Sequence, residues 1–262
     1  MSSTSVEALP SARGPQPLER DARPGLARLT RVELRKMVDT RSGFWLLLAV
    51  AALLLLVVVV VQIAGNEQDR VLREVLSAAV QTGVVLLPVV GILLVTAEWG
   101  QRTALVTFAL VPERLRVILA KVLAGTTLAL VAFFLALILA AISVAIASPG
   151  VDHTWTLPLG LLGQDALYAV LAMLMGLAFG TAFLNSAPAI VFYFGLPIAI
   201  GALGSISALQ GTAEWVETGA LAPLTEEVLN GTEWAQVLTA TLLWTALPLT
   251  VGLWRIRRNE VR

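Results

Sequence analysis

The stretch "LLLLVVVVV" at residues 53–61 decides the class of this protein. It lies inside a longer apolar run, residues 43–64, that contains no charged residue. A helix needs about 20 mostly apolar residues to cross the hydrocarbon core of a bilayer. A helix buried in a soluble protein requires no such uninterrupted run, so the stretch predicts a transmembrane helix.

The composition of the whole chain agrees with a membrane protein. Of 262 residues, 57% are hydrophobic and 14% are charged, and the mean hydropathy is +0.83, whereas soluble domains carry about 25% charged residues. The formal net charge is zero, which gives no reason to expect a nucleic-acid partner. Cysteine is absent, which excludes disulfides, thiolate metal sites and cysteine nucleophiles.

Six apolar segments are long enough to cross a bilayer, and together they predict an all-α polytopic membrane protein with one membrane domain over residues 43–255. The third segment is longer than a crossing requires, so we expect it to tilt or to project beyond the lipid. The six predicted spans are residues 43–64, 76–97, 117–147, 161–184, 187–209 and 234–254.

Basic residues gather in three segments that a six-span arrangement places on one side of the membrane. These segments precede the first span, connect the second to the third, and follow the last, and they hold all the basic residues except Arg70 and Arg73. The loops of the opposite side collect acidic residues instead. The positive-inside rule therefore predicts that both termini are cytoplasmic, and a five- or seven-span arrangement would split the basic segments between the two sides.

The segments outside the spans differ in character. Residues 1–25 are rich in Ser, Pro and charge and predict a disordered cytoplasmic N-terminus. Residues 26–42 repeat apolar side chains at helical spacing opposite arginines, which predicts an amphipathic interfacial helix; a solvated helix leading into the first span is the alternative. Residues 256–262 form a basic cytoplasmic tail. The outer segment, residues 210–233, is expected to form a short capping helix, with a plain acidic loop as the alternative.

The connection between the second and third spans reads "AEWGQRTALVTFALVPERLRVILAK" over residues 97–121. Its apolar residues alternate with polar ones until Pro112, so we expect a short helix at about 100–110 and then a bend. A helix joined rigidly to two spans could pass force from a soluble partner into the membrane. An ordinary basic loop explains the composition equally well.

This connection resembles the membrane subunit of ABC-2 type exporters, the permease half of bacterial ATP-binding cassette transporters. In that family a Glu–aromatic pair ends the second span, a Thr follows five residues after the Glu, and a Pro and an Arg-rich step lead to the third span. The matching positions are Glu98, Trp99, Thr103, Pro112, Arg114, Arg116 and Lys121, and Arg102 departs from the family by replacing its usual Gly. The segment before the first span also resembles the start of the family, in Glu33, Lys36, Arg41 and Trp45.

The resemblance implies a permease subunit of an ATP-driven exporter in the bacterial cell (inner) membrane. It would move a lipophilic or amphipathic substrate outward by alternating access, paired with a second permease copy or paralogue. Residues 98–116 would form the segment that couples it to separate ATPase subunits, through Glu98, Trp99, Arg102, Thr103, Phe108, Leu110, Pro112 and Arg114. We expect Glu98 to anchor this helix by an exposed pair with Arg102 or by accepting backbone N–H bonds, and Phe108 and Leu110 to fill an apolar cleft on the ATPase.

Enzymatic chemistry on this chain is not expected. Neither lysine belongs to a phosphate-binding G-x-x-x-x-G-K-[ST] loop, so ATP and magnesium would bind the partner subunit and no cofactor would bind here. The single histidine, His153, is expected in an exposed loop, which leaves an intramembrane enzyme as the weakest alternative. The stronger alternative is an ion-coupled secondary transporter. Such carriers use ionisable groups near mid-membrane, whereas Asp165 and the other acidic residues of the spans lie near span ends.

Neutral polar residues inside the spans are candidates for a substrate path. Hydrogen bonding to their own backbone or across helices is the stronger interpretation of them. The candidates are Gln81, Thr82, Thr126, Ser205, Ser207 and Thr241. The "GLAFG" at residues 176–180 is a GxxxG pattern, which favours close helix packing, within this chain's own bundle rather than with a partner chain.

Overall fold

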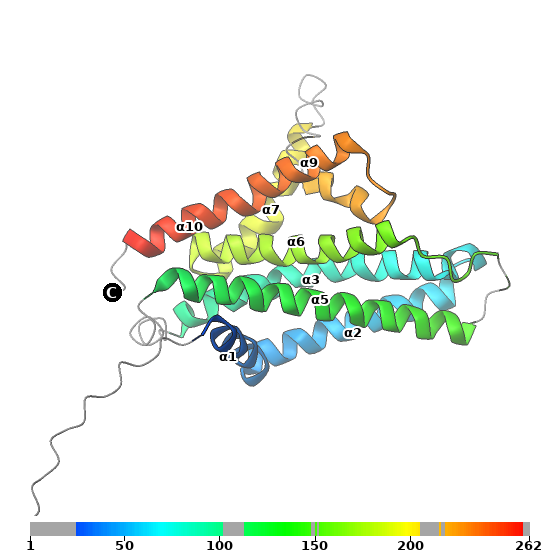
Figure 1. Ribbon diagram of the computed structural model, residues 1–262, viewed down its shortest axis with the longest axis horizontal. Coiled ribbons are helices and arrows are strands. Elements are labelled where there is room, and N and C mark those ends of the chain that lie inside the picture. Colours follow the sequence, from blue (N-terminus) through cyan, green and yellow to red (C-terminus); the bar gives the residue numbers. More distant parts are fainter. Residues whose placement is uncertain are drawn as a thin grey trace, which may run out of the picture.

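The structure is a computed structural model that describes residues 25–101, 113–147, 150, 152–204, 215 and 218–258. All regular secondary structure in these ranges is helical, which confirms the predicted all-α class. Long helices form a bundle, and one helix lies across its end (Figure 1). The long helices are α1 (Leu26–Asp39), α2 (Arg41–Ala64), α3 (Leu72–Gly100), α5 (Arg114–Ala147), α6 (Leu159–Phe183), α7 (Ser186–Gly204), α9 (Gly231–Thr241) and α10 (Leu247–Arg258), and the short ones are η1 (Glu67–Arg70), η2 (Thr218–Thr225) and η3 (Leu242–Ala246).

Within the described residues, five helices are long and apolar enough to cross a membrane: α2, α3, α5, α6 and the continuous helix Gly231–Arg258 made of α9, η3 and α10. They correspond to five of the six predicted spans and support a multi-pass membrane protein. Helix α5 has 34 residues, a length of about 51 Å at 1.5 Å per residue. That length exceeds a hydrocarbon core of about 30 Å, so the third span is as long as the sequence predicts.

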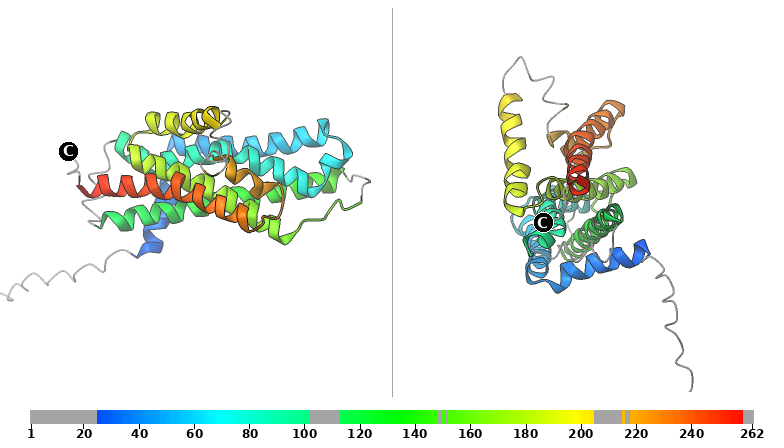
Figure 2. Two further views of the ribbon diagram at one scale, coloured as in Figure 1. Left: turned by 90° about the horizontal axis from the view of Figure 1, so that it is seen from above. Right: turned by 90° about the vertical axis from the view of Figure 1, so that its left-hand side faces the viewer.

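The fifth predicted span, residues 187–209, differs from the others. Helix α7 (Ser186–Gly204) covers the described part of this span, residues 205–209 lie outside the described residues, and α7 leans away from the bundle (Figure 2, right). The ends of α6 show where the chain stands before and after this segment. Near its start, α6 is bonded to the carbonyl oxygen of Leu224 through Gln164, and near its end the carbonyl oxygen of Ala182 accepts from Arg255 of α10. Helix α6 and the last long helix therefore run in the same direction.

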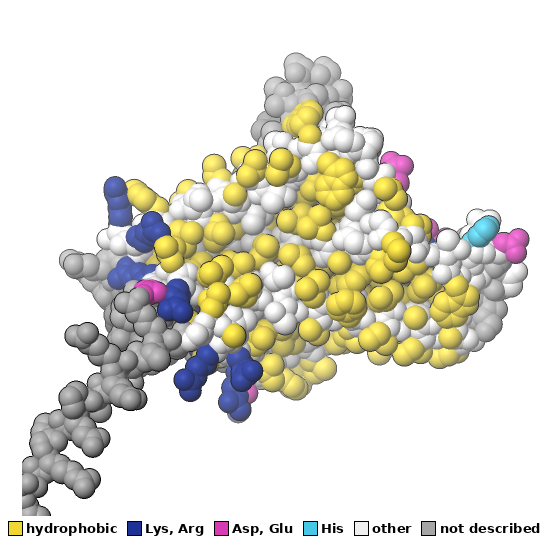
Figure 3. Space-filling model, in the orientation of Figure 1, with side chains coloured by type: hydrophobic (Ala, Val, Ile, Leu, Met, Phe, Trp, Pro, Cys, Tyr) yellow, Lys and Arg dark blue, Asp and Glu magenta, His cyan; other side chains and the backbone are white. Residues whose placement is uncertain are grey.

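The bundle has ends of opposite charge, as the sequence predicts for the described residues. Lys and Arg side chains gather at the end where α1, the start of α5 and the end of α10 lie, and the surface between the ends is largely apolar (Figure 3). We call this the basic end. The opposite, acidic end carries Glu67, Asp152 and Glu227. By the positive-inside rule, the prediction is that this basic end faces the cytoplasm.

Helices α3 and α6 share the most extensive interface of the described residues. Glycines on both helices allow the close approach. A Cβ on Gly176 would lie 2.5 Å from the Cα of Pro88, one on Gly91 would lie 2.8 Å from the backbone N of Leu177, and one on Gly180 would lie 2.9 Å from the carbonyl oxygen of Ile92. The GxxxG pattern at 176–180 therefore packs within the chain's own bundle, as the favoured interpretation expected.

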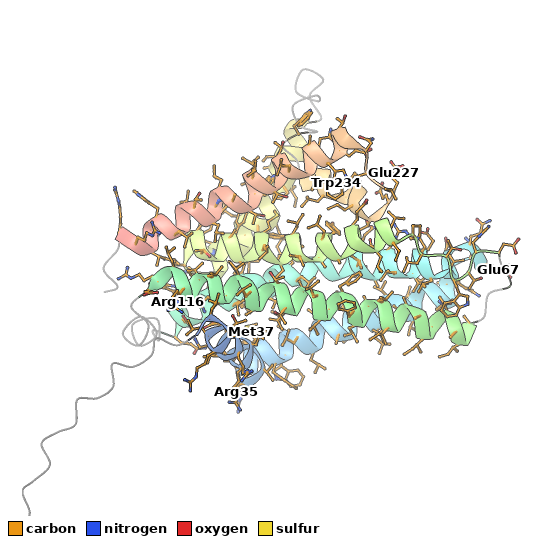
Figure 4. The ribbon with its side chains drawn as sticks, in the orientation of Figure 1. Arg35, Met37, Glu67, Arg116, Glu227 and Trp234 are labelled. Carbon is orange, nitrogen blue, oxygen red and sulfur yellow. The ribbon has the colours of Figure 1, made fainter. Side chains whose placement is uncertain are left out.

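The helix before the first span ends at Asp39, three residues earlier than predicted. The hydroxyl of Thr40 then caps α2 by accepting from the backbone N–H of Gly43 at 3.2 Å. Helix α1 lies across the basic end of the bundle (Figure 2), with Met37 turned toward the other helices and Arg35 away from them (Figure 4). This orientation is the one that an interfacial helix requires.

The predictions for the two termini have different outcomes. Residues 1–24 lie outside the described residues, so the structure does not test the predicted disordered segment. The last helix extends through Arg258, so the first three residues of the predicted basic tail are helical, and residues 259–262 lie outside the described residues.

The predicted sidedness can be tested with single cysteines, since the chain contains none of its own. We expect Asp152→Cys, which is exposed at the acidic end, to react with an impermeant maleimide in intact cells. Arg257→Cys at the basic end should react only after permeabilisation. The parent chain is the control for background labelling, and labelling of Arg257→Cys in intact cells would show that the predicted sidedness is wrong.

Candidate functional site

Four charged side chains from three helices meet at the basic end, and we call them the charged network. Glu33 and Lys36 come from α1, Glu98 from α3 and Lys121 from α5; the two lysines are the only ones in the chain. Lys121 Nζ lies 2.6 Å from Glu33 Oε2 and 3.2 Å from Glu98 Oε1. Lys36 Nζ lies 2.7 Å from Glu33 Oε1 and also pairs with Glu98. The network therefore links α1 directly to α3 and α5.

Most of this network is buried. The side chains of Lys121 and Glu33 are 3% and 6% exposed, that of Glu98 is 9% exposed, and that of Lys36 is 37% exposed. The Lys121 ammonium also donates to the carbonyl oxygen of Leu94 at 2.9 Å. Burying a single unpaired charge costs several kcal/mol, but two carboxylates and two ammonium groups balance one another. Removing any one of the four side chains would leave the buried charges unbalanced.

Lys36 is the most exposed member, and the two glutamates favour its charged form. Burial alone lowers the pKa of Lys36, but hydrogen bonds to Glu33 and Glu98 and their negative charges outweigh burial and raise its pKa above the usual value of 10.5. Lys36 therefore stays protonated. A cavity of about 290 Å³ lies beside the network and is also lined by Thr40, Ala97 and Gln101.

The structure brings together some of the residues that the resemblance singled out and separates others. Glu33, Lys36 and Glu98 belong to the charged network, whereas Arg41 and Trp45 are exposed at the start of α2. Trp99 is half-buried at the end of α3, and Arg114 donates to the carbonyl oxygen of Ile256, which connects the start of α5 to the end of α10. The remaining predicted coupling residues, Arg102, Thr103, Phe108, Leu110 and Pro112, lie outside the described residues.

The expectation that Glu98 belongs to an exposed pair was wrong, because its side chain is buried among two lysines. Sequence reasoning missed these partners because they come from distant parts of the chain. One signal could have found them. Lys121 follows several residues of an apolar run in which an ammonium group cannot be solvated, so it required an acidic partner on another helix.

A second polar cluster, at the acidic end, was also missed. Asp165 of α6 is fully buried 3.7 Å from Arg73 of α3, and Arg73 donates to the carbonyl oxygen of Thr225. Gln164 donates to the carbonyl oxygens of Leu224 and Glu227 at 3.1 and 2.8 Å. Part of the outer segment forms η2, and these bonds attach its end to α3 and α6. The predicted short outer helix is therefore present over residues 218–225.

The candidate substrate-path residues do not gather in one place. Gln81 donates to Thr225 Oγ1 at 3.1 Å and so belongs to the outer attachment. Thr82 and Thr241 donate to carbonyl oxygens of their own helices at 2.8 and 2.7 Å, which is the stronger of the two interpretations. Thr126 is half-buried in α5. None of these four lines a principal cavity of the described residues, and Ser205 and Ser207 lie outside those residues.

His153 is exposed in a turn with φ of 66°, which confirms its predicted place in a loop. Within the described ranges, no three His, Asp or Glu residues are grouped so that they could hold a metal ion. Comparison with models of known protein families gives no match for this chain, and comparison with curated proteins gives none either. The likeness to ABC-2 permeases therefore rests on the residues named above.

Proposed function

We propose that this chain is the membrane-spanning permease subunit of an ATP-driven exporter of the ABC-2 type. It would cross the bacterial cell membrane six times, with both termini in the cytoplasm and α7 within the fifth crossing. The charged network is the observation that supports this proposal most. It joins α1 to α3 two residues before that helix ends and to α5 near its start. These two helices flank residues 102–112, the centre of the proposed coupling segment.

The proposed mechanism follows from this connection. An ATPase subunit that moves residues 102–112 would move the cytoplasmic ends of α3 and α5 together. Since Lys121 and Glu98 are also bonded to α1, the helix on the membrane surface would follow the same movement. A second copy or paralogue would complete the substrate path, and ATP and magnesium would bind the ATPase subunits. The apolar character of the spans suits a lipophilic or amphipathic substrate.

An ion-coupled secondary transporter is the alternative, and one observation favours it. Both carboxylate oxygens of the fully buried Asp165 lack a hydrogen-bond partner, and a buried carboxylate of this kind is a candidate proton carrier. Against it, Asp165 lies near the outer start of α6 beside Arg73. Among the described residues, the middle portions of α2, α3, α5, α6, α7, α9 and α10 contain no Asp, Glu, His, Lys or Arg that could relay a proton onward.

The proposal can be tested by purifying the chain from its native membranes with whatever binds it. We expect an ATP-hydrolysing subunit to co-purify, and Phe108→Ala to weaken its retention at least about 30-fold, since a buried interface aromatic contributes about 2 kcal/mol or more. Phe108 is a better probe than Glu98, because loss of a buried charge would also harm folding. The matched control is Phe134→Ala, a half-exposed aromatic on the lipid-facing side of α5.

Two results would contradict the proposal. One is full assembly and full transport by Phe108→Ala. The other is ATP hydrolysis by the purified chain alone, since it lacks the loop that binds phosphates. Transport that depends on a proton gradient and not on ATP would favour the ion-coupled alternative.

A further inference from the structure

A cavity of about 430 Å³ lies between α6, α7 and the last long helix, and every side chain that lines it is apolar. Its volume is within the roughly 300–1,000 Å³ typical of sites for small molecules. Phe179 and Phe183 line it from α6, Phe192 and Ile200 from α7, and Trp244 from η3. All of these residues are in the described part of the chain.

The cavity exists because two elements depart from regular packing. Helix α7 leans away from its neighbours (Figure 2), and it carries Pro197 in its interior. On the other side, η3 is a single turn of π-helix over Leu242–Ala246 that contains the buried Trp244. Such turns are rare, and they occur frequently at functional sites.

Aromatic rings form the walls of the cavity and support one another. The rings of Trp244 and Phe179 are stacked with centroids 6.2 Å apart, and those of Phe183 and Phe192 are stacked at 4.8 Å. Stacked pairs of this kind hold their side chains in fixed orientations. The cavity is therefore formed before a ligand enters it.

On the last helix, two arginines lie on the same face as the residues that line this cavity. Val251 lines the cavity and is half-exposed, and Arg255 and Arg258 follow at spacings of four and three residues, which keeps them on the same side of the helix. Arg255 donates to the carbonyl oxygen of Ala182, and the guanidinium of Arg258 lies 4.5 Å from the ring centroid of Trp254. Each guanidinium has five N–H donors, so both retain donors for an anion.

We infer that this cavity binds an acyl chain of an anionic phospholipid, whose headgroup lies against Arg255 and Arg258. The apolar walls suit a hydrocarbon chain, and the two arginines lie at the basic end, where the headgroups of one leaflet are. Basic sites between membrane helices recognise anionic headgroups because each Arg near the surface contributes about 1 kcal/mol. The inference does not depend on the proposed transport.

The charge of Arg255 and Arg258 favours an anionic lipid over two other candidate occupants of the cavity, a neutral lipid and a second copy of this chain. A neutral lipid would fill the cavity but would make no use of the arginines. A second copy of this chain, arranged with its basic end on the same side, would bring further arginines against Arg255 and Arg258. An anionic headgroup complements both of them.

The test compares two lipids with identical chains, dioleoyl-phosphatidylglycerol and dioleoyl-phosphatidylcholine, bound to the purified full-length chain and counted by native mass spectrometry. We expect the anionic lipid to be retained preferentially. Arg255→Gln with Arg258→Gln should weaken its binding about 30-fold, the equivalent of about 2 kcal/mol, and should leave the neutral lipid unaffected. Leu196→Trp, which fills the cavity from a half-exposed position on α7, should reduce the binding of both lipids.

The control is Arg31→Gln with Arg35→Gln, which removes two exposed arginines of α1 from the same end and should keep the preference. Arg258→Gln alone changes an exposed side chain and should lower the preference about fivefold even if Arg255 proves necessary for folding. Equal retention of the two lipids by the parent chain would overturn the inference. So would a preference that survives the loss of both arginines, or a Leu196→Trp variant that changes the oligomeric state and leaves lipid binding intact.

Discussion

Replacing Lys121 with methionine is expected to destabilise this protein by about 3–5 kcal/mol, the usual cost of removing one partner from a buried ion pair. Methionine retains the apolar part of the side chain but removes the charge. Glu33 and Glu98 would then share Lys36 alone, and the buried network would carry a net negative charge. The carbonyl oxygen of Leu94 would also lose the donor at 2.9 Å. For a chain of this size, the expected fall in Tm is about 10 °C.

Thermal unfolding of the purified protein in detergent would measure this effect. The matched control is Arg116→Met, which removes a charge from the same helix. Arg116 pairs with Glu113 at 3.5 Å and both side chains are partly exposed, so its loss should cost at most about 1 kcal/mol. Similar Tm values for the two variants would show that the charged network does not stabilise the fold.

A double variant separates charge balance from packing. Glu33→Gln removes one of the two carboxylates that Lys121 neutralises. If the uncompensated charge is the cause of the instability, Lys121→Met combined with Glu33→Gln should be more stable than the sum of the two single changes predicts. Simple addition of the two effects would instead indicate lost packing.

The class of the fold could be predicted from residues 53–61 and the five similar runs, because crossing a bilayer imposes a minimum length on any helix. The position of Lys121 in an apolar run indicates that it needs an acidic partner, but the sequence does not identify which residues form the charged network. Lys36 and Glu98 are 62 residues apart, and Lys121 and Glu33 are 88 apart. Their pairing depends on how α1 lies across the bundle, and a pattern within one helix carries no information about that placement.

The tilt of α7 shows a second limit of sequence reasoning. Its apolar run resembles the other predicted spans, and hydropathy measures how well a segment tolerates lipid. It does not measure the angle at which the segment packs, which depends on neighbouring helices. The bonds that attach the outer segment to α6 could not be predicted either, because they join residues that are distant in the sequence. Gln164 and Asp165 stand side by side near the start of α6, and this pattern does not identify their partners, yet Gln164 bonds to the backbone of three residues between 224 and 229.

Gly176→Ala is expected to lower stability by at least about 2 kcal/mol, although only one methyl group is added. The new Cβ would lie 2.5 Å from the Cα of Pro88, and it would also meet the carbonyl group of that residue. These are backbone atoms of α3, so no side chain can rotate to make room. Helices α3 and α6 would have to separate along the most extensive interface of the described residues, and added atoms in a well-packed interior typically cost about 1–3 kcal/mol.

Gly163→Ala is the matched control, because Gly163 lies on the same helix and a Cβ there would meet nothing within 4 Å. Alanine favours a helix over glycine by about 1 kcal/mol, so this variant should keep or raise the Tm while Gly176→Ala lowers it by several degrees. The difference between the two variants therefore reports the helix–helix contact and not helix propensity. If Gly176→Ala left the Tm unchanged, α3 and α6 would not be in close backbone contact at Gly176 and Pro88.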